Sequence, residues 1–154
     1  MQKEIEKNLK LVKESAHNAA LKAGLNPNNV LLVAVSKKKD EESIKAAFDF
    51  GIKDFGENYA QELSVKSDFF KDEEIVWHFI GPIQTNKIKL IAKHASWIHS
   101  LDRSKVVEKL NKECLQAERH INALIQINIS GEETKSGISP DKLLEFAEYV
   151  NTQT

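Results

Sequence analysis

The sequence is poor in cysteine, proline and glycine, and it has no long hydrophobic run. Its 154 residues include one cysteine, Cys114, with three prolines and six glycines. A single cysteine excludes a disulfide framework within the chain and any metal site built on a CxxC pair, so a reducing compartment is the default. No run approaches the roughly 18 apolar residues that a membrane-spanning helix needs.

An excess of charge of one sign is also absent. The chain carries 22 Lys+Arg and 23 Asp+Glu, for a net charge of -1. This balance disfavours a nucleic-acid binder that works by neutralising phosphates, and a polybasic membrane anchor. The first seven residues contain no apolar stretch typical of a signal peptide. We therefore expect a cytoplasmic protein that contacts neither nucleic acid nor membrane.

Common ligand-binding motifs are missing as well. The sequence contains no GxGxxG, no P-loop, no HExxH and no EF-hand pattern. The five histidines show no spacing typical of a metal site. Cys114 falls on an apolar helical stripe, which indicates a buried structural thiol. We expect no metal ligand in this chain.

The hydrophobic pattern that is present predicts a helix followed by strand–helix units. Apolar residues at gaps of three and four predict an N-terminal helix over residues 1–24, and five units fill residues 30–154. Asp40 and Asp102 are expected to cap two of the helices, and Ser139 with Pro140 to begin the last one. The expected strands are 30–35, 52–55, 75–80, 97–101 and 123–129. The first expected helix between them starts after Asp40 and ends at Gly51, and the others cover 59–70, 84–94 and 103–119.

Two parallel α/β architectures fit five such units, an open doubly wound sheet and a (β/α)₈ barrel. The first predicted strand, 30–35, is apolar throughout, as expected for a strand buried on both faces. In the last, Ile125, Ile127 and Ile129 alternate with polar residues, which favours a barrel whose polar residues face inward. We therefore expect a single incomplete TIM-barrel domain over residues 1–154, comprising about five of eight units.

Functional groups in such folds follow the carboxyl ends of the strands, and Lys37 is the leading candidate there. A lysine directly after a buried strand is expected to be partly desolvated, which lowers the pKa of its amine and favours Schiff-base chemistry. The alternative is that residues 37–39, three consecutive lysines, form a solvated basic loop. Lys38 and Lys39 are expected to face solvent.

Further candidates follow the next three strands. Glu57 and Asn58 could present a carboxylate and an amide into a pocket, or could simply begin a helix after a turn at Gly56. His78 lies within an apolar strand, where a structural histidine is more common than a ligand. His99 has the same two interpretations.

Several segments together resemble the pyridoxal phosphate homeostasis proteins (the YggS/PROSC type). The resemblance spans nearly the whole chain in the same order, and its motifs are highly specific in combination. They are Ala34-Val35-Ser36-Lys37, Phe55-Gly56-Glu57-Asn58-Tyr59-Ala60-Gln61-Glu62, Trp77-His78-Phe79-Ile80-Gly81-Pro82-Ile83-Gln84-Thr85-Asn86-Lys87, His99-Ser100-Leu101-Asp102, Gln126-Ile127-Asn128-Ile129-Ser130 and Lys135-Ser136-Gly137.

The resemblance implies a barrel like the alanine racemase N-terminal domain, with pyridoxal 5′-phosphate (PLP) held as a Schiff base on Lys37. It also implies that Asn58 lies near the cofactor ring and that His78 and Ser100 line the pocket. Members of the family bind PLP and control its level without being known as efficient enzymes, and are generally monomeric. Delivery to enzymes that lack their PLP is an implied partnership.

The chain departs from the family by stopping near the fifth unit. In barrels of this type, loops after the seventh and eighth strands grip the phosphate. We therefore expect weak phosphate binding and, because an open sheet exposes its edges, self-association. Two other functions stay open: a PLP-dependent amino-acid racemase or lyase of the same fold, and a fragment that binds a protein partner but no cofactor.

Overall fold

The computed structural model describes residues 2–153, and they form one parallel five-stranded sheet with helices. The helices are α1 (Gln2–Lys22), α2 (Glu41–Asp49), α3 (Ala60–Phe69), α4 (Ile88–His94), α5 (Ser104–Gln116) and α6 (Leu143–Thr152). The strands are β1 (Ala34–Val35), β2 (Asp54–Glu57), β3 (Val76–Phe79), β4 (Trp97–Leu101) and β5 (Asn122–Ile125). Short 3₁₀ turns cover Pro27–Asn29, Thr85–Lys87 and Pro140–Lys142.

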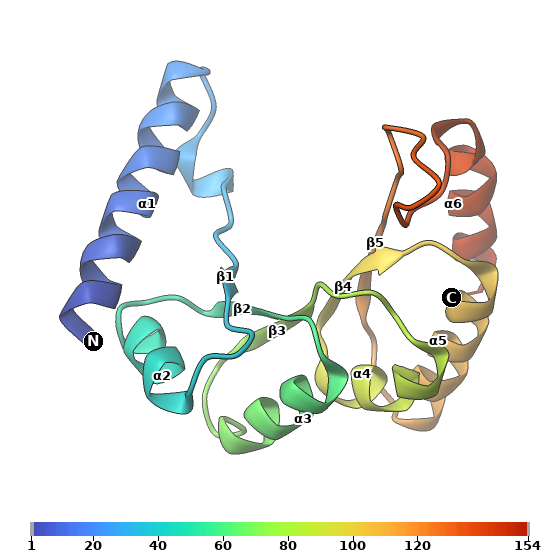
Figure 1. Ribbon diagram of the computed structural model, residues 1–154, viewed down its shortest axis with the longest axis horizontal. Helices are drawn as coiled ribbons and strands as arrows, with labels where there is room; N and C mark the ends of the chain where they lie inside the picture. The colour runs from blue at the N-terminus through green and yellow to red at the C-terminus, as the bar shows by residue number, and fades with distance from the viewer. Residues whose placement is uncertain (1, 154) are drawn as a thin grey trace.

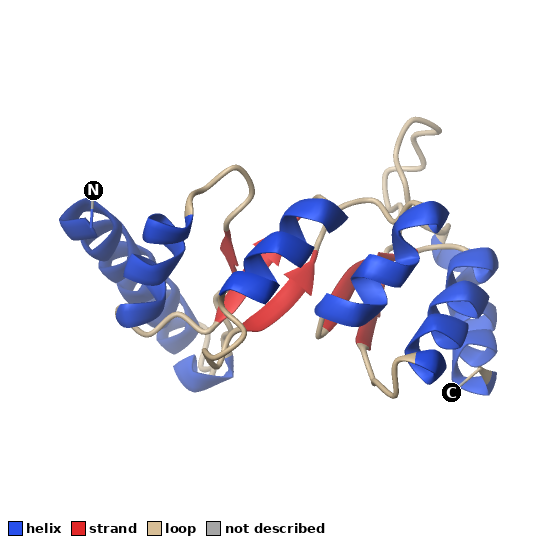
Figure 2. Cartoon of the chain, turned by 90° about the horizontal axis from the view of Figure 1, so that it is seen from below, coloured by secondary structure: helices blue, strands red, loops and turns tan. Residues whose placement is uncertain are grey.

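The strands pair in chain order, β1-β2-β3-β4-β5, and every pairing is parallel. The sheet curves into an arc whose convex side is covered by α2, α3, α4 and α5, while α1 and α6 flank its two ends (Figure 1). A doubly wound sheet would reverse its strand order and carry helices on both faces. Figure 2 shows the helices packed on one side of the strands. The predicted barrel architecture is therefore confirmed for the first five strands.

The hydrophobic core lies between the convex face of the sheet and its helices. Every second residue of β2 and β3 points from the convex face into this core. Phe55 and Trp77 are paired in register there, with 5.9 Å between their ring centroids. Burying each large side chain contributes about 1.5–3 kcal/mol. Its largest fully buried apolar members are Phe55, Phe79, Ile44, Leu63, Ile88, Ile91, Ile98, Leu101 and Val106.

Helix starts follow the sequence signals in two cases out of three. Asp40 caps α2, because its side chain accepts a hydrogen bond of 2.9 Å from the backbone N–H of Ser43. Ser139 and Pro140 begin the 3₁₀ turn that leads into α6. Asp102, however, is not the cap of α5: Arg103 occupies that position without a side-chain cap.

Both edge strands are shorter than predicted. Only residues 34–35 of the expected strand 30–35 pair, and Val30 and Leu31 are exposed, because this strand has a neighbour on one side only. The expected strand 123–129 ends at Ile125. Beyond it a single bridge joins Ile127 to Ile138, and Ile129 is 85% exposed. The prediction of a strand whose apolar face is buried as far as Ile129 is therefore wrong.

No helix within residues 2–153 is long and apolar enough to cross a membrane.

Candidate functional site

Three of the four predicted site residues lie at or just beyond the carboxyl ends of neighbouring strands. The fourth lies within a strand, before its carboxyl end. Lys37 follows β1 after one intervening residue, Asn58 directly follows β2, and Ser100 is the penultimate residue of β4. His78 lies in the middle of β3, opposite Gly56 of β2. Because the strands are parallel, the residues after them share one rim of the arc.

Gly81, just beyond β3, joins two of these residues. The hydroxyl of Ser100 donates a hydrogen bond to the carbonyl oxygen of Gly81. A Cβ atom on Gly81 would lie only 2.2 Å from the backbone oxygen of Asn58, so only glycine lets these two loops meet. The ends of β2, β3 and β4 are therefore tied together. Lys37 stands one strand further along, where the preceding N–H of Ser36 donates to Gly56 at 2.9 Å.

Lys37 is exposed to solvent, so the prediction that it is partly desolvated is wrong. The physical reason is that β1 is an edge strand and the turn after it projects beyond the sheet. Within residues 2–153, the Lys37 and Asn58 side chains take part in no hydrogen bond or ion pair. The site therefore offers a free amine and a free amide from adjacent strands. Lys38 and Lys39 are exposed, as expected.

His78 is buried on the concave face and is already fully hydrogen-bonded. Its Nε2 lies 2.9 Å from Oδ1 of Asp54, and its Nδ1 lies 2.9 Å from Nε2 of His99. Its ring also stacks on Trp97, with 6.0 Å between centroids and 8° between planes. Burial, and then the neighbouring His78, lower the pKa of His99. These bonds make His78 a brace between β2, β3 and β4, and Ser100 is committed in the same way to Gly81.

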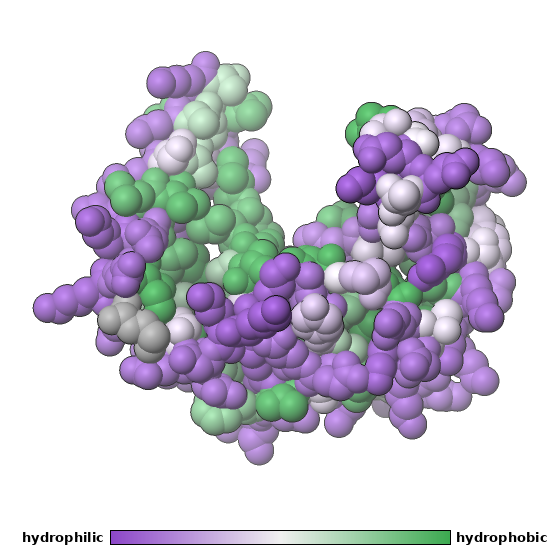
Figure 3. Space-filling view, in the orientation of Figure 1, coloured by the Kyte–Doolittle hydropathy of each residue, from purple (hydrophilic) through white to green (hydrophobic). Residues whose placement is uncertain are grey.

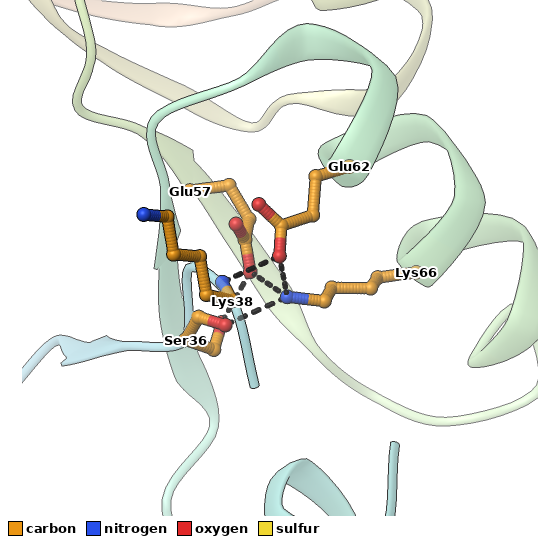
Figure 4. Close-up of polar contacts among 5 residues, drawn as sticks. All are labelled: Ser36, Lys38, Glu57, Glu62 and Lys66. Atoms are coloured by element: carbon orange, nitrogen blue, oxygen red, sulfur yellow. Dashed lines mark hydrogen bonds and ion pairs between the residues drawn. The ribbon is translucent and has the colours of Figure 1, made fainter. Parts of the chain in front are cut away.

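Glu57 does not present its carboxylate into a pocket. Its side chain is fully buried and faces α3, where it meets the ammonium group of Lys66, itself 4% exposed. We call the residues drawn in Figure 4 the Lys66 cluster: Ser36, Lys38, Glu57, Glu62 and Lys66.

Every donor of the Lys66 ammonium has an acceptor in this cluster. The Nζ atom lies 2.6 Å from the carbonyl oxygen of Ser36, 2.7 Å from Oε1 of Glu57 and 2.8 Å from Oε1 of Glu62. The same Glu57 oxygen accepts a bond of 2.7 Å from the Ser36 hydroxyl, and the same Glu62 oxygen accepts one of 2.6 Å from the N–H of Lys38. One buried lysine thus links β1, β2 and α3.

The pKa values of the two carboxyl groups in the cluster are shifted in opposite directions. Burial raises the pKa of Glu57, and the hydrogen bonds from Lys66 and Ser36 only oppose that rise. Burial also acts to raise the pKa of Glu62, but the bonds from Lys66 and from the backbone of Lys38 outweigh it and lower the pKa overall. Because its carboxylate is fully buried, Glu57 depends on Lys66 for its charge compensation.

A hollow of about 470 Å³ opens beside the rim, at the ends of β3, β4 and β5. Arg103 reaches into its wall and donates to the carbonyl oxygen of Ile83 at 2.6 Å. The chain's other arginine, Arg119, is bonded to the end of α4. Arg103 also pairs with Asp102 at 3.2 Å, but its side chain is 54% exposed and keeps N–H donors for an anion, whereas Arg119 is engaged away from the rim. The hollow is lined by Pro82, Ile83, Gln84, Thr85, Asn86, Ser100, Asp102, Arg103, Gln126 and Ser136.

Sequence reasoning missed Lys66 as part of the site. A signal was nevertheless available, because Leu63, Lys66 and Phe70 follow one another at gaps of three and four on α3 and its end. A lysine within such an apolar stripe either extends its amine to solvent or meets a buried partner, so the pattern marks Lys66 as a candidate. Asp54 was missed as well, and here no such signal was available. The face of β2 on which it lies becomes clear only from the register with β3.

Comparison with known proteins places the chain in a family. The model of the family "Alanine racemase, N-terminal domain" matches residues 3–154. A pyridoxal phosphate homeostasis protein of Haemophilus influenzae is 43% identical over 148 residues, which are 95% of this chain and 62% of that protein. The protein of the same name from Escherichia coli K12 is 41% identical over 150 residues, which are 96% of this chain and 64% of that protein.

Solved structures give the same answer. A protein of unknown function from Bifidobacterium adolescentis superposes with a TM-score of 0.92 at 29% identity, over 98% of this chain and 65% of that one. PipY of Synechococcus elongatus, solved with PLP bound, superposes with a TM-score of 0.75 at 29% identity, over 90% and 64%. The chain thus spans less than two thirds of these relatives. It belongs to the family of the alanine racemase N-terminal domain, and the resemblance to the pyridoxal phosphate homeostasis proteins is confirmed.

Proposed function

We propose that this chain binds PLP, holds it as a Schiff base on Lys37 and serves in cytoplasmic PLP homeostasis without being an enzyme. The single observation that carries this proposal is the exposed Lys37 amine, which makes no hydrogen bond or ion pair within residues 2–153. The homeostasis proteins and the PLP-bound PipY structure among its relatives support the choice of cofactor.

The residues of the rim fit the aldehyde end of PLP better than its phosphate end. An amine condenses with an aldehyde with loss of water, and Lys37 supplies that amine. Asn58, on the next strand, has an amide free to bond the ring substituents. Arg119 is engaged with the end of α4, and Arg103 is partly engaged with Ile83 and Asp102, so the phosphate would find only part of one guanidinium among the described residues. The bonded His78 and Ser100 would line the pocket as braces for the strands that carry it.

We infer a non-enzymatic role because the carboxylates nearest Lys37 in residues 2–153, those of Glu57 and Glu62, are bonded to Lys66. A racemase or lyase would need a second acid–base group, such as a tyrosine. Tyr59 follows Asn58 as the N-cap residue of α3 and is 55% exposed, with no side-chain capping bond, and Tyr149 on α6 donates to Glu108 at 2.9 Å. We further propose that residues 1–154 act as a single incomplete barrel domain, and that its partners beyond PLP are enzymes awaiting their cofactor.

An absorbance titration of the chain with PLP tests the proposal. We expect a visible Schiff-base band that saturates and survives dialysis, and that disappears in Lys37→Ala. The matched control is Lys39→Ala, which removes an exposed lysine from the same turn and should leave the band in place. A band that persists in Lys37→Ala, or no stable band in the unaltered chain, would overturn the proposal.

A further inference from the structure

We propose that the Lys66 cluster fixes the backbone on both sides of Lys37 and so selects this lysine, among three consecutive ones, as the attachment point for an aldehyde. This inference rests on the proposed function, because it concerns the same amine. It goes beyond that function by naming Glu62, Glu57 and Lys66 as positioning residues, which act on Lys37 through the backbone.

The cluster holds both peptide groups that flank Lys37. The carbonyl oxygen of Ser36 belongs to the peptide before Lys37, and it accepts the bond of 2.6 Å from Lys66. The N–H of Lys38 belongs to the peptide after Lys37, and it donates the bond of 2.6 Å to Glu62. The side chain of Ser36 is anchored in addition by its bond to Glu57. Lys37 is thus suspended between two fixed points although its own side chain is free.

The turn adopts a conformation that needs such support. Lys38 has a φ of 58°, in the left-handed region that residues with a Cβ atom seldom occupy. A residue in that region persists where its surroundings hold it. The N–H of Lys39 donates to Ser36 at 3.0 Å and closes the turn, while the bond from Lys38 to Glu62 secures its centre.

Solvent exposure does not distinguish the three lysines, since residues 37–39 are all exposed. Their amines have the same intrinsic chemistry, so selection among them must come from where the backbone points each side chain. Figure 4 shows the ammonium end of Lys38 directed away from the cluster. Loss of the bond between Lys38 and Glu62 should therefore let all three amines react with an aldehyde, although their own chemistry is unchanged.

Glu62 is the residue at which to test this. Its side chain is 24% exposed, at the outer side of the cluster. Replacing it removes one of the three acceptors of the Lys66 ammonium but leaves the buried ion pair of Lys66 with Glu57 and the bond of Lys66 to Ser36. In Glu62→Ala the Lys38 N–H loses its acceptor. Glu62→Gln keeps an oxygen for that N–H and should rescue it. Glu74→Ala is the matched control, because it removes an exposed carboxylate that pairs with Lys53 at 2.8 Å, away from the turn.

Two readouts are needed. Amide hydrogen exchange by NMR reports on Lys38 without any cofactor, and we expect exchange about ten-fold faster in Glu62→Ala than in the unaltered chain. Borohydride reduction after exposure to PLP, followed by fragment-ion mapping, gives the share of adduct on each of residues 37–39. We expect most of the adduct on Lys37 in the unaltered chain, Glu62→Gln and Glu74→Ala, and a spread over all three lysines in Glu62→Ala.

An unfolding midpoint of Glu62→Ala close to that of the unaltered chain shows that the fold is intact. An unprotected Lys38 amide in the unaltered chain, or an adduct still confined to Lys37 in Glu62→Ala, would overturn the inference. Failure of the proposed function gives a different pattern: no adduct on Lys37 in the unaltered chain, whatever the exchange at Lys38, and that result removes the selection as well.

Discussion

At the scale of single residues, His94 is a buried histidine that the site does not use. It lies at the end of α4, with Nε2 3.1 Å from the hydroxyl of Ser64 and Nδ1 2.5 Å from that of Ser67, both on α3. Burial lowers its pKa below the ordinary 6.5, and the carboxylate of Asp68 only partly opposes this. The neutral imidazole thus joins two helices.

The lowered pKa predicts how stability changes with pH. The unfolded chain takes up a proton at His94 near pH 6.5, whereas the folded chain resists it until the pH is lower. The contribution of His94 is therefore complete above pH 6.5 and is lost as the pH falls toward the folded pKa. Urea unfolding across this range should show a shallower pH dependence in His94→Gln than in the unaltered chain. His17→Gln, which removes an exposed histidine of α1, should leave the dependence unchanged; an equal slope in His94→Gln would contradict the assignment.

At the scale of elements, Arg119 ties the end of α4 to the segment after α5. Its guanidinium donates to the carbonyl oxygens of Ala92 at 2.9 Å and Ala95 at 3.0 Å, and also to that of Lys93. The last carbonyls of a helix have no partner within the helix, and a cation there also meets the negative end of its dipole. One side chain therefore completes the carboxyl end of α4.

We expect Arg119→Met to lower the free energy of unfolding by about 2 kcal/mol, because several charge-assisted bonds disappear together. Arg119→Lys should recover only part of this, since an ammonium cannot reproduce the fork of the guanidinium. Urea denaturation measures both. Lys112→Met, at an exposed position of α5, is the control and should change stability little. If Arg119→Met lowered the free energy of unfolding no more than this control does, the bonds from Arg119 would not stabilise the carboxyl end of α4.

The elements also show which parts of the fold could be predicted from the sequence. Local signals placed the central strands and helices well: β4 has the predicted bounds, and Asp40 caps α2 as expected. The edges failed, because hydrophobicity at Val30 or Ile129 does not reveal whether a neighbouring strand exists to cover it. The site was found only in part for the same reason. Lys37 could be located by its motif, but its exposure depends on whether a second strand pairs with β1, which the motif does not reveal.

At the scale of the whole molecule, the open arc leaves apolar surface in contact with water. Figure 3 shows hydrophobic residues gathered on the inner side of the arc, along α1 and the segment leading to β1. Between the end of α1 and the end of β1, Leu25, Leu31 and Val35 are 62%, 63% and 51% exposed. β1 in addition has an unpaired edge, since its only partner within residues 2–153 is β2. A free strand edge beside apolar surface is a template for pairing with another chain.

We therefore expect this 154-residue chain to self-associate through β1 and the segment before it. Sedimentation velocity at micromolar concentration should show dimers or larger species, and Leu31→Lys should shift the distribution toward monomer, because a charge on the edge opposes strand pairing. Leu144→Lys is the matched control: Leu144 is 72% exposed but lies on α6, at the other end of the arc, so the oligomers should remain. A monomer with a sharp unfolding transition would refute this expectation. It would also mean that the concave face is stable in water without a partner, and that PLP capture at Lys37 can be studied in one isolated chain.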